Sequence, residues 1–225
     1  MPDCYVDLNG CPPFLHRAVK SWYLWQGVWL RELGRRPGDD QREPKPGETP
    51  EQVFWGRQPP MMTKNCELGL VDDADVSYYL ICENDGYYID TEERRFRRRY
   101  WMFRRFEDAE KYLLFIISQM ARSGKYTDSV SYRWAQEGLD ARVSLRRPDP
   151  VNFPGRVSLT VDNKATDRGW MAESDAANAS HILVLKFEEV DTLLCESIPA
   201  GWFTIDIVTD QRNLPDAYSK GWSKI

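Results

Sequence analysis

Arginines and aromatic residues are interleaved in one stretch of the chain, residues 94–105. Seven of its twelve residues are arginine, and four others are aromatic: Phe96, Tyr100, Trp101 and Phe103. A guanidinium group binds phosphate or carboxylate through paired hydrogen bonds, and an aromatic ring stacks on a base or fills a pocket. The stretch could therefore bind a nucleic acid, bind an acidic protein, or be a charged edge strand that repels unwanted pairing.

The charge of the whole chain disfavours nucleic acid. The chain has 225 residues, a formal net charge of -5 and a sequence pI of about 5.2. Nucleic-acid-binding proteins usually carry the opposite balance, because neutralising phosphates supplies much of their affinity. With 42% hydrophobic and 13% aromatic residues, the chain is expected to fold as a globular protein. These values favour a protein partner for the arginines.

Alternation along a strand predicts how this stretch is presented. Successive side chains of a strand point to opposite faces, so Arg97 and Arg99 are expected to share a face with Trp101 and Phe103. Both faces change from arginine to apolar residues, which predicts an exposed first half and a buried second half from Tyr100 on. The candidate partner-binding residues are Arg94, Arg95, Arg97, Arg98, Arg99, Glu92 and Glu93.

Nearby acids are expected to neutralise part of this charge. The four carboxylates closest in sequence are Glu92, Glu93, Glu107 and Asp108. If the arginines form a protein interface, reversing Arg97 and Arg99 to glutamate should slow association and leave thermal stability almost unchanged.

Signatures of catalysis are missing from the sequence. It has no GxSxG, no HExxH, no glycine-rich phosphate loop and no GxGxxG after a strand. Cys195 and His181 are the nominal nucleophile and base, but Cys195 falls on the apolar side of an expected helix, where an inert buried thiol is the simpler reading. The five cysteines include no CxxC pair, and the two histidines lie far apart. We therefore predict no enzyme, and no catalytic, cofactor-binding or metal-binding residue.

The elements around the arginines suggest three parts. Residues 1–33 form an N-terminal helical extension, because apolar residues between positions 14 and 33, three tryptophans among them, recur at helical spacing. Residues 34–50 are rich in proline, glycine and charge and are expected to be a flexible linker. Residues 51–225 are expected to form a single domain. No secretory signal or membrane span is recognisable, so a cytoplasmic location is expected.

The body alternates strands and helices. Two aromatic runs flank Asn84-Asp85-Gly86, which predicts a hairpin with a primed turn. A third strand follows through Phe106, and then a helix that closes at Gly124. Further strands are expected at 141–147, 155–162, 167–174, 181–187 and 202–208, the last one ending the sheet, with a short helix after residue 187. The fold class is α+β, mainly an antiparallel sheet with two or three helices plus the N-terminal helical extension.

Several of these segments resemble immunity proteins of bacterial polymorphic-toxin systems, and in particular the group that neutralises NAD glycohydrolases of the tuberculosis-necrotizing-toxin type. The similar segments are Phe54-Trp55, the aromatic strand 76–82, "DGYYIDTEER" at 85–94, "EKYL" at 110–113 and "SHILVLKFEEVDTLL" at 180–194.

The resemblance implies a non-enzymatic, cytoplasmic antitoxin. Such a protein binds its cognate toxin one to one and occludes the active site, without a cofactor and without a membrane. The alternative function is nucleic-acid binding by residues 94–105.

Overall fold

The structure is a computed structural model that describes residues 5–8, 10–40, 42–72, 76–122, 126–196, 198–203 and 206–208. Its contacts divide the chain into two compact units. The first unit comprises residues 1–74, 117–123 and 197–225, and the second comprises residues 75–116 and 124–196. Helices and mainly antiparallel strands make up both, so the predicted α+β class is confirmed.

The first unit is built on helix α1, His16–Glu32, which begins after a 3-10 turn, η1, Pro13–Leu15. The predicted helix is confirmed, and its helical spacing places Trp22 and Trp25 in the core, 4% and 1% exposed. The tryptophan stripe of this helix is therefore mainly core packing.

Helix α2, Pro50–Trp55, packs against α1 within the same unit. The Trp55 side chain is fully buried, and its ring lies 4.9 Å from that of Tyr23. The Gln26 Nε2 donates a 2.7 Å hydrogen bond to the Trp55 carbonyl oxygen, and the Tyr23 hydroxyl donates one of 2.8 Å to Glu51. Because these bonds join residues about 28 positions apart, they fix the two ends of the intervening segment.

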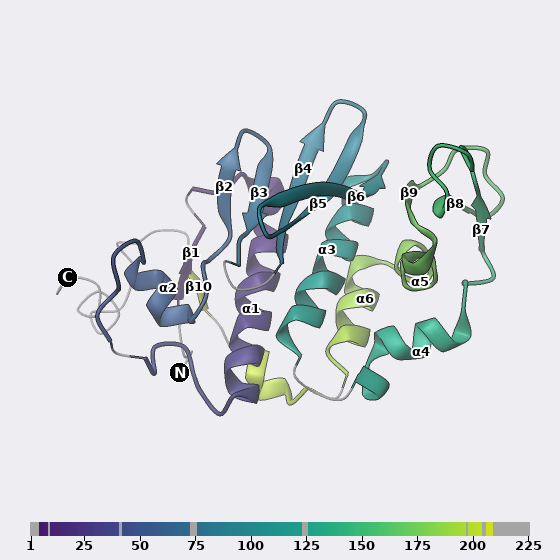
Figure 1. The fold of residues 1–225 in the computed structure, drawn as a ribbon. Helices are drawn as coiled ribbons and strands as arrows, with labels where there is room; N and C mark the ends of the chain where they lie inside the picture. The colour runs from purple at the N-terminus through teal and green to yellow at the C-terminus, as the bar shows by residue number, and fades with distance from the viewer. Residues whose placement is uncertain are drawn as a thin grey trace. The chain divides into compact units, whose positions relative to one another are not determined.

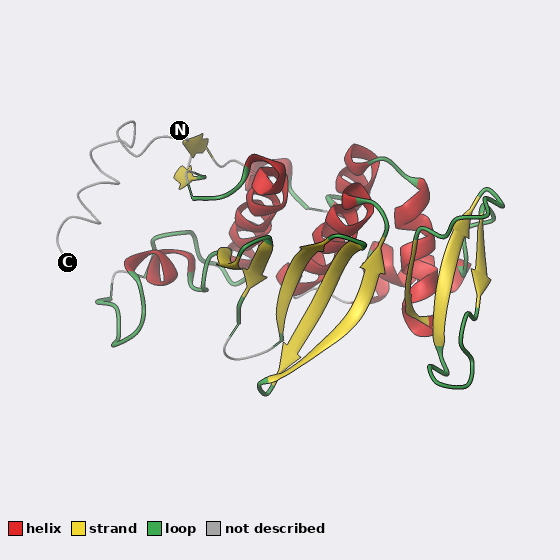
Figure 2. Ribbon diagram, turned by 90° about the horizontal axis from the view of Figure 1, so that it is seen from above, coloured by secondary structure: helices red, strands yellow, loops and turns green. Residues whose placement is uncertain are grey.

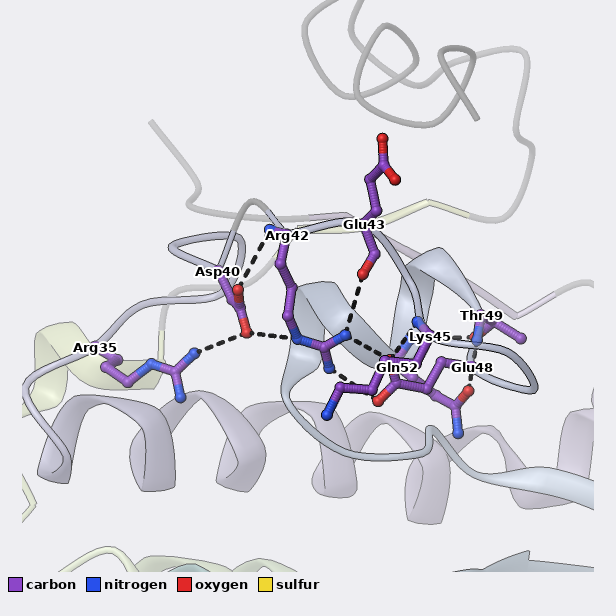
Figure 3. A network of polar contacts seen from close by, with 8 residues as sticks. All are labelled: Arg35, Asp40, Arg42, Glu43, Lys45, Glu48, Thr49 and Gln52. Carbon is purple, nitrogen blue, oxygen red and sulfur yellow. Dashed lines mark hydrogen bonds and ion pairs between the residues drawn. The ribbon is translucent and has the colours of Figure 1, made fainter.

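A polar network occupies that intervening segment (Figure 3). Arg42 donates a 2.8 Å hydrogen bond to Glu48 and lies 3.3 Å from Asp40, which also faces Arg35. The hydrogen bond from Arg42 lowers the pKa of Glu48 to about 2. The start of α2 is fixed by a capping box between Thr49 and Gln52. The predicted flexibility of residues 34–50, and the predicted domain start at residue 51, stay predictions.

Two small strand pairs complete the first unit. Strands β2, Met61–Lys64, and β3, Glu67–Leu70, form an antiparallel hairpin. Strand β10, Asp206–Val208, follows a 3-10 turn, η4, Ala200–Phe203, and pairs in parallel with β1, Tyr5–Asp7. The prediction that residues 202–208 end the main sheet is therefore wrong, because β10 belongs to a separate sheet with the N-terminal strand.

The second unit contains six antiparallel strands in the order β4-β5-β6-β9-β8-β7. Their bounds are β4 Ser77–Glu83, β5 Gly86–Glu93, β6 Phe96–Phe103, β7 Val143–Arg146, β8 Arg156–Val161 and β9 Gly169–Ala172. The predicted hairpin, third strand and strand pair are confirmed.

The turns that join β4 to β5 and β5 to β6 differ from the prediction. Neither Asn84 nor Asp85 has a positive φ, so the β4–β5 turn is not a primed turn. Positive values occur instead in the β5–β6 turn, at Arg94 (52°) and Arg95 (68°). A two-residue hairpin loop with both φ values positive is a type I′ turn, which usually contains Asn-Gly.

The helices of the second unit cover one face of its sheet (Figures 1 and 2). Helix α3, Phe106–Ala121, begins in this unit and continues into the first from Ile117. The others are α4 Val130–Glu137, α5 Ala176–Val184 and α6 Phe187–Leu194. Rings of Trp101 and Phe103 each lie 5.4 Å from Tyr112 of α3. The expected end of α3 at Gly124 and the polar tail from Asp210 lie outside the described residues.

The prediction of a strand at 181–187 is wrong. The run "HILV", residues 181–184, belongs to α5, whose buried residues Ala176, Ala179, Ile182 and Leu183 recur at helical spacing. A short apolar run fits a strand as well as a buried helix, and the alanines upstream decide for the helix. The short helix predicted after it is α6.

Candidate protein-binding site

A bulge in β6 determines where its arginines point. Asp90 pairs with Arg99 but Ile89 pairs with Trp101, so Tyr100 is an extra residue in β6. Beyond such a bulge the alternation shifts by one residue. Arg97 and Arg99 therefore lie on the face opposite to Trp101, and the prediction that they share a face with Trp101 and Phe103 is wrong.

The face that carries Arg97 and Arg99 is not covered by the helices of its unit (Figure 2). There, guanidinium groups lie over aromatic rings of neighbouring strands. The Arg97 guanidinium carbon is 3.9 Å from the ring centre of Tyr79, and that of Arg99 is 3.8 Å from Tyr88. We call this surface the arginine–tyrosine face; it comprises Tyr79, Tyr88, Arg97 and Arg99.

Carboxylates hold these guanidinium groups in place. Asp90, 8% exposed, accepts hydrogen bonds from the Nε of Arg97 (3.1 Å) and of Arg99 (3.4 Å). Arg99 also donates two hydrogen bonds to Glu83, and this pairing raises the pKa of Arg99. The predicted partners of the arginines were Glu92, Glu93, Glu107 and Asp108. For Arg97 and Arg99, the partners found are Asp90 and Glu83.

Carboxylates also hold the hydroxyl groups of the two tyrosines in place. Tyr79 donates a 2.9 Å hydrogen bond to Glu92, and Tyr88 donates one of 2.7 Å to Asp85. Burial, and then the accepting carboxylate, raises the pKa of both phenols, so both remain protonated donors at neutral pH. Glu92 is thus a structural partner of Tyr79.

This geometry restricts what the arginine–tyrosine face can bind. The Tyr79 and Tyr88 rings are 8% and 5% exposed, because the arginines lie on them. A base could stack on either ring after displacing a guanidinium group from both its ring and its carboxylate. The arginine–tyrosine face is therefore a poor stacking platform and a well-ordered surface for a protein.

The other predicted residues gather at the turn between β5 and β6. Phe96 is 72% exposed, and the Arg94 side chain is 88% exposed with Glu93 3.7 Å away. Arg95 and Arg98 are exposed, and neither side chain has a hydrogen bond or ion pair among the described residues. We call Arg94, Arg95, Phe96 and Arg98 the hairpin tip.

The structure thus separates the seven predicted residues. Arg94, Arg95, Arg98 and Glu93 lie in or next to the exposed turn, whereas Arg97, Arg99 and Glu92 belong to the paired network on the sheet. Sequence reasoning missed the residues that order this network, Tyr79, Glu83, Tyr88 and Asp90. A two-residue loop at 94–95 fixes the register that places Asp90 opposite Arg99, but the sequence has no Asn-Gly there to indicate that loop.

The nominal catalytic residues lie on different helices, His181 in α5 and Cys195 at the end of α6. The Nε2 of His181 lies 2.9 Å from the carbonyl oxygen of Gly138, and its ring stacks on Trp134 at 5.5 Å. Cys195 is partly buried at the end of α6. Among the residues that the structure describes, no group of three or more His, Cys, Asp or Glu could hold a metal ion.

No helix in the described part of the chain is long and apolar enough to cross a bilayer.

Comparisons with known proteins assign no family. A scan against models of protein families finds no match, and a search of curated proteins finds none. Among solved structures, the chain is similar to "Rv3902c from M. tuberculosis" with 18% sequence identity and a TM-score of 0.47, over 64% of this chain and 82% of that one.

Proposed function

We propose that this chain is a cytoplasmic immunity protein that binds a cognate toxin of the NAD-glycohydrolase type, one to one, and occludes its active site. It acts as a binding protein and not as an enzyme. The sequence resemblance at residues 85–94 and 110–113 supports the toxin class. The hairpin tip supports the mode of action.

The observation that carries the proposal is the exposed β5–β6 turn. Phe96 is 72% exposed, and the nearby side chains of Arg95 and Arg98 have no hydrogen bond or ion pair among the described residues. Exposed aromatic residues and arginines are the residue types that most often anchor protein interfaces. Arg94 and Arg95 also adopt left-handed backbone conformations, which cost a non-glycine residue on the order of 1 kcal/mol each. Asn-Gly would adopt this turn at a lower cost in free energy, so arginines at both positions indicate that their charge has a function.

The tip and the arginine–tyrosine face contribute differently. The uncompensated charge of Arg95 and Arg98 attracts an acidic surface beside the toxin cleft and speeds encounter. Arg97 and Arg99 are already ordered by Asp90 and Glu83, so they lose little conformational entropy on binding.

Nucleic-acid binding remains the alternative, and Arg95 and Arg98 favour it because free guanidinium groups can contact phosphates. The covered rings of Tyr79 and Tyr88 and the net charge of -5 weigh against it. Titration with single-stranded RNA at increasing salt separates the two, since phosphate binding falls steeply with salt.

Co-expression tests the proposal. The proposal expects a toxin domain to be encoded next to this gene. Bacteria would produce that domain with and without this chain, and their NAD content and growth would be measured. The proposal expects NAD and growth to be retained with the chain, and the two proteins to purify as a one-to-one complex. NAD loss in the presence of a well-expressed chain would refute it.

A further inference from the structure

The second edge of β6 is largely unpaired. Along β6, Phe96 to Phe103, every residue except the bulged Tyr100 is in register with β5. On the other side, β9 pairs with Met102 and Phe103. In the part of the chain that the structure describes, no strand pairs with residues 96–100 on this side, so these residues form a strand edge of about 17 Å.

The side chains along this edge leave it accessible. Phe96, Arg98, Arg99 and Tyr100 are all exposed. The edge becomes covered beyond Tyr100, where the Trp101 Nε1 donates a 2.9 Å hydrogen bond to Asp175 of the 3-10 turn η3, Glu173–Asp175. The accessible length is thus bounded by the turn at one end and by Trp101 at the other.

Charge selects the kind of strand that can pair there. Arg98 points to one side of the sheet and Arg97 and Arg99 to the other, and Arg98 has no partner among the described residues. A second copy of this chain would bring arginines against arginines, which destabilises a strand pair. A strand rich in Asp or Glu would place carboxylates next to Arg98 and next to the arginines of the turn.

We propose that residues 96–100 of β6 accept an extended acidic segment of a partner protein as an added strand. The main chain supplies hydrogen bonds along the edge, and Arg98 with the hairpin tip selects for acidic side chains. The assignment of that segment to the toxin rests on the proposed function, whereas the strand-accepting edge can be tested without the toxin.

The test uses two synthetic peptides and the full chain. In one peptide glutamate alternates with valine, and in the other lysine alternates with valine. Amide hydrogen exchange of the chain is followed residue by residue by NMR. At ten times its Kd, the glutamate peptide should slow exchange of the edge-facing amides of residues 96–100 by about tenfold. The lysine peptide should leave them unchanged.

Charge reversal supplies the matched variants. Arg98→Glu should weaken binding of the glutamate peptide and strengthen binding of the lysine peptide. Lys164→Glu makes the same change of charge at an exposed position in the loop between β8 and β9, and should alter neither.

Three outcomes would overturn the proposal. They are no protection of residues 96–100 by the glutamate peptide, equal protection by both peptides, and a dimer of the free chain that protects the same amides. The last outcome would assign the edge to a second copy. If co-expression failed to preserve NAD while the glutamate peptide still protected these amides, the assignment of the acidic segment to a toxin would be refuted. The proposal that residues 96–100 accept a strand would stand.

Discussion

Asp90 lies between Arg97 and Arg99 and determines what charge reversal there does. The Arg97→Glu, Arg99→Glu double variant would place two more carboxylates beside one that is 8% exposed, and would remove both cation–π contacts. We expect a loss of about 2–3 kcal/mol in the free energy of unfolding, measured by urea denaturation. This corrects the expectation from sequence that these two arginines could be reversed without affecting stability.

Arg95 and Arg98 provide the comparison for that variant. Neither side chain has a polar partner among the described residues, so Arg95→Glu with Arg98→Glu should change the free energy of unfolding by less than about 0.5 kcal/mol. Equal losses in the two double variants would contradict the division between the hairpin tip and the arginine–tyrosine face.

Asp175 makes stability depend on pH. Burial raises the pKa of its carboxyl group, which accepts a 2.9 Å hydrogen bond from Trp101. The folded state therefore holds this proton more tightly than the unfolded state, and the contribution to stability is lost as pH rises from about 4 through the folded pKa. Asp175→Asn keeps an acceptor oxygen for Trp101 and removes the titration. Its free energy of unfolding relative to the wild type should increase over that pH range; a constant difference would contradict the raised pKa.

At the scale of elements, the β5–β6 turn is built from residues that strain it. Replacing Arg94 by Asn and Arg95 by Gly supplies the residues that a type I′ turn prefers. We expect the variant to be more stable by about 1 kcal/mol, measured by thermal denaturation, and to bind its partner more slowly. An unchanged or lower stability would show that the arginines are not strained in the turn.

The N-terminus of α3 is held by a buried charge cluster. Asp108, fully buried, accepts a 2.7 Å hydrogen bond from Arg168 and lies 3.2 Å from the Nζ of Lys111. Lys111 also donates a 2.8 Å hydrogen bond to the Leu185 carbonyl oxygen, after α5. Asp108→Ala would leave the buried Lys111 and the partly buried Arg168 without their carboxylate and should cost about 3–5 kcal/mol in urea denaturation. A loss below 1 kcal/mol would mean that water reaches the cluster.

Periodicity predicted the long and regular elements. Helices α1 and α3 and the β4–β5 hairpin follow from apolar spacing and aromatic runs. The bulge at Tyr100 gives no signal in alternation, and it alone moved Arg97 and Arg99 to the other face. The sequence predicts that Asp108 neutralises arginines of residues 94–105. Its pairing with Arg168 depends on β9 lying beside β6, which local pattern does not show.

At the scale of the whole molecule, the position of the arginines says more about what the protein can bind than its net charge does. The chain carries a net charge of -5, yet two arginines at or near one exposed turn, Arg95 and Arg98, have no hydrogen bond or ion pair among the described residues. The order of expected strands and helices correctly predicted an α+β fold. The parallel pairing of β1 with β10 joins residues from opposite ends of the chain and was not predictable from local pattern.

The central claim, that the hairpin tip binds a toxin, is tested most directly by association kinetics with the toxin domain encoded next to this gene. The wild type, the Arg95→Glu, Arg98→Glu double variant and the Lys164→Glu control would be compared at low and high salt. We predict association about tenfold slower for the double variant at low salt, a smaller difference at high salt, and wild-type rates for the control. Equal association rates for the wild type and the double variant at low salt would contradict it.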